Sequence, residues 1–242
     1  AGINGALLVQ GRDALVLDRS DAYIGVMIDD LITKGVNDPY RLLTSRAEHR
    51  LLLRQDNADI RLTRIGREIG LVRDGRWQAF SRKAELIDAE IARLQNTYVK
   101  GIDHEKLPQV DLANVNRRIS LEDLLRRPEI KYADIARLNG RPEDLPSDVE
   151  EQVELQIKYD GYISRQRIQV ERHKRLEAMR VPDDLDYAGI SSLSREGREK
   201  FARILPSSIG QASRIPGITP ADISILMVVI ERLRRENAPE SV

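Results

Sequence analysis

The sequence has 242 residues, of which 41% are hydrophobic and 32% charged, and its 39 basic and 39 acidic residues give a formal net charge of zero. These proportions are typical of a globular chain with one large domain or two smaller ones, and they exclude a disordered protein. The absence of cysteine excludes disulfides, thiolate metal sites and thiol nucleophiles, and it is compatible with a reducing cytoplasm. No apolar run approaches the ~18–20 residues of a membrane span, so we expect no membrane partner.

The first 40 residues predict two helices and a strand. The segment 1–10 resembles the end of a helix closed by Gly11, because glycine suits the left-handed position after a helix. The short apolar run 14–18 predicts a strand, and 21–34 predicts a second helix. We interpret 1–40 as the edge of an α/β domain whose main part is absent. With no initiator methionine and no signal-peptide pattern, the sequence is expected to be part of a longer protein.

The next segment, 41–64, is unusually basic. Residues 41–100 hold 13 basic and eight acidic residues, although the whole chain is neutral. Ser45 and Glu48 match the S-x-x-E pattern of a capping box, which predicts that a helix starts there. On that helix three arginines would lie in one row at i, i+4 and i+8, with a fourth just before it. These candidate phosphate-binding residues are Arg41, Arg46, Arg50 and Arg54.

Arginine favours phosphate binding because its planar guanidinium makes paired hydrogen bonds. The spacing alone also fits a solvated face on which acidic neighbours neutralise the arginines, and it does not favour phosphate binding over that interpretation. The three histidines, His49, His104 and His173, are far apart in the sequence, and none has metal-ligand spacing. We therefore expect no metal site, and we expect His49 to pack or to form a hydrogen bond.

Helical patterns dominate the rest of the chain, so the predicted fold class is mainly α, with a helical bundle and a small helical tail. The predicted helices are 59–70, 76–98, 120–127, 131–138 and 148–180. Segments 101–118 and 139–148, which are rich in turn residues, are the predicted linkers. Gly161 inside the long helix suggests close helix packing or contact with a partner, because glycine weakens a helix interior.

These patterns predict four parts. We expect a domain edge at 1–40, a basic junction helix at 41–64, a helical domain at 65–185 and a small docking domain at 186–242. The last part also carries a row of surface arginines, Arg195, Arg198, Arg203 and Arg214.

Several stretches together resemble the C-terminal portion of the GidA or MnmG family of flavoproteins, which modify the wobble uridine of certain tRNAs. They are AGIN at 1–4, YIGVMIDDLITKG at 23–35, PYRLLTSRAEHRLLLRQDNADIRLT at 39–63, QIKYDGYISRQ at 156–166, LDY at 185–187 and GQASRIPGITPADIS at 210–224. The stretches follow one order and cover almost the whole chain. His49 departs from the family's pattern, which often has tyrosine at this position.

The resemblance implies a cytoplasmic, homodimeric enzyme that binds FAD, uses NADH and methylene-tetrahydrofolate, and acts with the GTPase MnmE. The product carries an aminomethyl or carboxymethylaminomethyl group at C5 of the uridine. The family's flavin fingerprint and reactive cysteine are absent here, so we expect no catalysis by this chain alone and no catalytic or metal-binding residue in it. Gly2 and Asn4 would lie at the edge of the FAD site, and the four arginines of 41–54 would hold tRNA phosphates. The surface row of Arg195, Arg198, Arg203 and Arg214 would be the candidate contact set for the partner protein. The alternative is a protein-interaction module without nucleic-acid contact.

Overall fold

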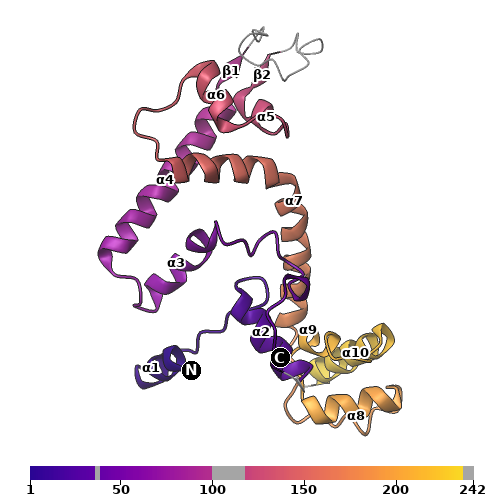
Figure 1. The fold of residues 1–242 in the computed structure, drawn as a ribbon. Helices are drawn as coiled ribbons and strands as arrows, with labels where there is room; N and C mark the ends of the chain where they lie inside the picture. Colours follow the sequence, from indigo (N-terminus) through magenta and orange to yellow (C-terminus); the bar gives the residue numbers. More distant parts are fainter. Residues whose placement is uncertain (36–38, 100–117, 237–242) are drawn as a thin grey trace, which may run out of the picture. The chain divides into compact units, whose positions relative to one another are not determined.

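The structure is a computed structural model that describes residues 1–35, 39–99 and 118–236. Its chain divides into two compact units, and each unit takes two separate parts of the sequence. Unit 1 consists of residues 1–15 and 53–165, and unit 2 consists of residues 16–52 and 166–242. Both are built from helices (Figure 1), which confirms the predicted mainly α fold class. None of the helices in the described ranges is both long and apolar enough to cross a membrane.

Unit 1 is a helical domain with one small antiparallel sheet. Its elements are α1 (Gly2–Val9), α3 (Ala58–Glu68), α4 (Asp74–Asn96), β1 (Tyr98–Val99), β2 (Ile119–Ser120), α5 (Leu121–Leu125), α6 (Tyr132–Asn139) and the first part of α7 (Ser147–Ala178). The register of the sheet pairs Tyr98 with Ser120. Apolar side chains of α4, α5, α6 and α7, including Leu94, Leu124 and Val153, form its core.

Unit 2 combines the segment around α2 with the C-terminal helices. Its elements are α2 (Tyr23–Thr33), the 3-10 turn η1 (Thr44–Arg46), the last part of α7, α8 (Arg195–Ile204), α9 (Ile209–Ser213) and α10 (Pro220–Glu236). Its core contains Phe201, Ile209 and Leu226, all fully buried. The α8 and α9 helices begin at serines whose hydroxyls accept a backbone N–H, the usual cap that satisfies a free donor at a helix start.

The predicted helices of 1–35 and 58–178 are confirmed to within a few residues. Gly11 and Gly35 have φ of +66° and +64° just after α1 and α2, as expected of residues that end helices. The predicted linker 139–148 is confirmed as the connection between α6 and α7, whereas residues 101–117 of the other linker lie outside the described residues. Of the two interpretations of Gly161, close helix packing was wrong, because a Cβ there would meet nothing within 4 Å in the described part of the chain. Contact with a partner stays a prediction.

Two local predictions were wrong. Residues 14–18 form no strand with any described segment, and the side chain of Asn4 bonds the N–H and the C=O of Leu15 instead, at 2.9 and 3.0 Å. The helix predicted from Ser45 does not form. Only η1 is helical there, turns follow it, and the next α-helix begins at Ala58. The Glu48 side chain, which would have capped that helix, pairs with Arg19.

The two units divide the chain differently from the four predicted parts. The C-terminal core begins before residue 186, since Val181 is buried in it and Leu176 and Met179 pack against it. The segment 41–52 belongs to unit 2, and 53–64 belongs to unit 1. A helical tail that starts at 186 is therefore not a separate compact body.

Candidate functional site

A buried arginine, Arg19, lies at the centre of a polar network in unit 2. It follows Asp18 in a turn that precedes α2, and it is 8% exposed. The turn lies directly against Gly25 of α2, where a Cβ would come within 2.1 Å of the Asp18 carbonyl oxygen. Glycine is thus required for the close approach that brings Arg19 beside α2.

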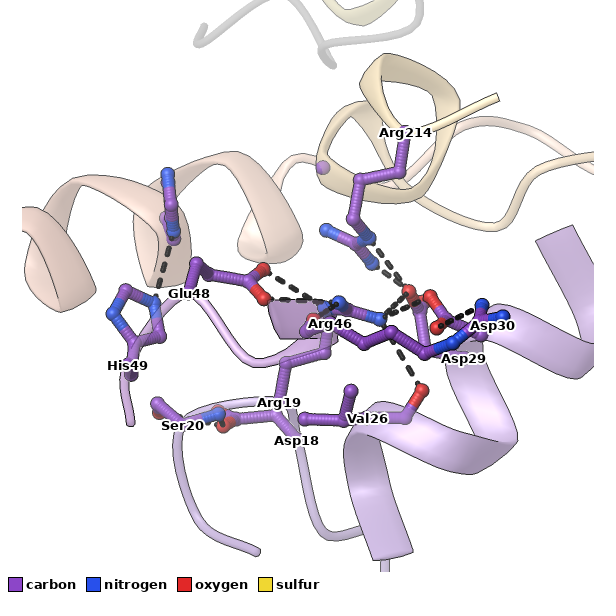
Figure 2. A network of polar contacts seen from close by, with 12 residues as sticks. Asp18, Arg19, Ser20, Val26, Asp29, Asp30, Arg46, Glu48, His49 and Arg214 are labelled. Carbon is purple, nitrogen blue, oxygen red and sulfur yellow. Dashed lines mark hydrogen bonds and ion pairs between the residues drawn. The ribbon is translucent and has the colours of Figure 1, made fainter. Parts of the chain in front are cut away.

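The guanidinium of Arg19 donates to three carboxylates and two carbonyls (Figure 2). Its Nε and Nη2 bond the two oxygens of Glu48 at 2.8 and 2.9 Å. Its Nη1 reaches Asp30 at 2.8 Å and Asp29 at 2.9 Å. Burial alone would lower the pKa of Arg19, and these partners raise it instead. A buried charge is tolerated only with such pairing, so the network lets Arg19 stay charged although it is buried.

Asp30 is the most buried carboxylate of the network, at 1% exposure. It accepts hydrogen bonds from Arg19, from Lys34 at 2.8 Å and from the hydroxyl of Tyr40 at 2.9 Å. Burial alone would raise the pKa of Asp30, but these hydrogen bonds lower it to about 2. Asp30 is therefore ionised at neutral pH.

A second arginine, Arg214 at the end of α9, joins the network. It bonds both oxygens of Asp29 at 2.7 and 2.6 Å and also pairs with Glu177 of α7. Gly210 lets the Glu177 carboxylate approach α9, because a Cβ there would overlap it. Arg214 thus ties α2, α7 and α9 together. It is a partly buried structural residue, and its predicted place in an exposed arginine row was wrong.

The network holds the segment that follows η1. Arg19 bonds the Arg46 carbonyl at 3.0 Å as well as the Glu48 carboxylate, so both ends of this short stretch are fixed. Arg46 itself lies over the Tyr40 ring, 4.7 Å from its centre, and 3.6 Å from Asp30. Its guanidinium is only partly exposed, which leaves limited surface for a ligand.

The four candidate phosphate-binding arginines do not form one helical row. Arg41 and Arg50 are exposed in unit 2, and within the described part of the chain neither makes an ion pair. Arg54 belongs to unit 1, where it pairs with Asp56 at 3.0 Å and lies 5.3 Å from the centre of the Tyr159 ring. The structure therefore leaves Arg41 and Arg50 as the most accessible of the four.

The other candidate residues differ in accessibility. On α8, Arg203 is exposed, Arg198 is half-buried, and Arg195 is exposed but pairs with Glu199 at 3.0 Å. Gly2 is exposed at the start of α1, with open space around it. The bonds of Asn4 to Leu15 give this side chain a structural role within unit 1.

A cavity of about 250 Å³ lies beside the network in unit 2. Arg19, Glu48 and Arg214 line it, together with two histidines and the apolar Ile28 and Ile32 of α2. Arg19 and Arg214 already bond carboxylates, whereas Arg180, which also lines the cavity, makes no ion pair with the described residues.

Comparison with known families identifies the chain's relatives. The family model described as the MnmG/GidA tRNA-modifying enzyme C-terminal helical domain matches residues 74–167, and the model of the C-terminal helical bundle of the same enzyme matches 169–241. The chain belongs to the MnmG/GidA family. The border between the two matches lies in α7, close to the border between units 1 and 2.

Individual relatives agree with this assignment. The chain is 54% identical over 241 residues to the tRNA uridine 5-carboxymethylaminomethyl modification enzyme MnmG of Heliobacterium modesticaldum, and 48% identical over 237 residues to that of Caldicellulosiruptor saccharolyticus. Each alignment covers 97% of this chain and 38% of the relative, so the chain spans little more than a third of these MnmG proteins. The GidA crystal structure from Aquifex aeolicus matches with a TM-score of 0.79 and 40% identity, over 95% of this chain and 36% of that one.

Proposed function

We propose that this chain is the tRNA-binding and partner-binding part of an enzyme that modifies C5 of the wobble uridine. The observation that carries the proposal is the alignment of nearly the whole chain, at about half identity, with proteins named tRNA uridine 5-carboxymethylaminomethyl modification enzymes. In this proposal the whole enzyme is a cytoplasmic homodimer that uses FAD, NADH and methylene-tetrahydrofolate together with MnmE. The chain itself contributes binding and not the chemical step.

The proposed tRNA contacts are Arg41 and Arg50, with Arg46 and Arg54 in supporting roles. Arg50 follows a stretch that Arg19 fixes at Arg46 and Glu48, so its backbone starts from a held position and loses less freedom on binding. Guanidinium contacts to phosphate position a nucleic acid without reading its sequence. The two exposed arginines therefore suit a role in placing tRNA.

The proposed partner surface is α8, through Arg203 and Arg195. Arg198 is only half-exposed and would contribute less. Arg214 is not part of this surface, because its guanidinium already pairs with Asp29 and Glu177.

Ion pairing of Arg46, Arg54 and Arg214 favours a second candidate, a protein-interaction module without tRNA contact. Fluorescence anisotropy with labelled tRNA separates the two. We expect the Arg41→Ala/Arg50→Ala variant to bind tRNA at least about tenfold more weakly than the wild-type chain, as the loss of two phosphate contacts predicts. The matched control is Arg76→Ala/Arg82→Ala, which removes two exposed arginines of α4 and should bind normally. No measurable tRNA binding by any of the three proteins would support the interaction module, and equal measurable affinity would assign the tRNA contacts to other residues.

A further inference from the structure

Two histidines that are 124 residues apart in the sequence lie side by side in unit 2. His49 Nε2 is 3.2 Å from His173 Nδ1, and the ring centres are 5.2 Å apart with the planes tilted by 53°. His49 follows η1 and is 2% exposed, whereas His173 is exposed on α7. The spacing of the histidines in the sequence does not predict this pair, because only the fold brings the two rings together.

Glu48 completes a cluster of three groups that can each bind a metal. One carboxylate oxygen of Glu48 and one ring nitrogen from each histidine lie within 4.8 Å of one another. Arg19 bonds the Glu48 carboxylate, which still has unused lone pairs. Metal-binding carboxylates in proteins usually have such a hydrogen-bonded partner, which fixes their orientation.

The spacing of the nitrogens suits a tetrahedral zinc ion. With Zn–N bonds of ~2.0–2.1 Å, two ligands at the tetrahedral angle are about 3.3 Å apart. A neutral imidazole ring is the form that binds metals. The Nδ1 of His49 is buried and has no hydrogen-bond partner among the described residues. It can therefore carry the ring proton when Nε2 binds the metal.

We propose that Glu48, His49 and His173 bind one divalent zinc ion, with its fourth position open to the 250 Å³ cavity that these residues line. Two histidines and a glutamate with one open position form a ligand set that zinc adopts in proteins. The ion ties the segment between Arg46 and Arg50 to α7. This inference does not depend on tRNA binding, because it rests only on the three ligands.

Calorimetric titration of the chelator-treated chain with zinc chloride tests the proposal. We expect one zinc per chain, and at least about tenfold weaker binding by His173→Ala, since one of three protein ligands is lost. His173 is exposed, so this variant should fold. His104→Ala removes the remaining histidine and should bind zinc like the wild type. No binding by the wild-type chain, which would mean that the histidines only share a hydrogen bond, would overturn the proposal. Equal affinity of His173→Ala would overturn it as well.

Cobalt(II) supplies a second readout, because four-coordinate cobalt absorbs visible light much more strongly than six-coordinate cobalt. The wild-type chain should show the strong spectrum, and His49→Phe, which keeps an aromatic plane without a ligand atom, should lose it. Circular dichroism of His49→Phe checks that the buried site still folds, and His173→Ala gives the same test without a buried change. A strong spectrum that survives in both variants would place the ion elsewhere and contradict the site.

Discussion

Arg19 is the residue on which the candidate site depends. It lies among Asp29, Asp30 and Glu48 with little exposure to solvent, and no periodic pattern in the sequence marks it. The basic segment 41–64 predicted where arginines gather, but not that an arginine outside it would hold that segment. Such a contact joins residues almost thirty positions apart, and the fold alone creates it.

Removal of the Arg19 guanidinium should lower the free energy of unfolding. Arg19→Met keeps most of the side-chain volume but leaves Asp30 and Glu48 short of a partner, and loss of one member of a buried ion pair costs about 3 kcal/mol. We therefore expect the free energy of unfolding, measured in urea at pH 7, to fall by about that amount. Arg76→Met on the exposed face of α4 is the control and should change it by less than about 0.5 kcal/mol. Similar urea midpoints for both variants would show that the network adds little stability.

The network also predicts how stability depends on pH. Asp30 has a pKa of about 2 in the folded chain against 3.8 ordinarily, so the folded state favours its ionised form. The resulting stability is present above pH 3.8 and is lost as the pH falls toward 2. Asp30→Asn should therefore show a shallower decline of unfolding free energy between pH 4 and 2 than the wild type. Asp74→Asn, whose carboxylate is largely exposed, should keep the wild-type decline. An unchanged decline in Asp30→Asn would contradict the assigned pKa.

At the scale of elements, helices were predictable where local signals decided them. Glycines mark the ends of α1 and α2, and apolar periodicity marks α4 and α7. The failures at 14–18 and 45–54 have a shared physical cause. A strand exists only with a neighbouring strand, and a capping box forms only if its glutamate is not taken by another partner. Asn4 and Arg19 supply the competing contacts.

Substitution of two glycines separates the effect of local helix propensity from the effect of tertiary packing. Gly161 lies exposed inside α7 with open space around it, so Gly161→Ala should raise the free energy of unfolding by about 1 kcal/mol. Gly25→Ala should lower it, because its Cβ would overlap the Asp18 carbonyl. Thermal or urea unfolding of both variants measures the two effects. Destabilisation by Gly161→Ala would mean that this face of α7 packs against another surface.

At the scale of the whole molecule, the resemblance in the sequence led to the correct family, and the family models and relatives confirm it. The division into parts was not predictable in the same way. Each unit joins segments far apart in the chain, and residues 16–52 find their partners only after residue 165. Charge along the sequence predicted a basic segment, but only the folded units show which arginines are already paired.

The proposed contacts of Arg41 and Arg50 to tRNA phosphates have one most direct test. It is the tRNA affinity of the chain over a series of salt concentrations, for the wild type and for Arg41→Ala/Arg50→Ala. We expect a steep fall of affinity with salt for the wild type, and a log–log slope that is shallower by about 2 in the variant. Identical slopes, or no binding by the wild-type chain at low salt, would contradict the proposed contacts.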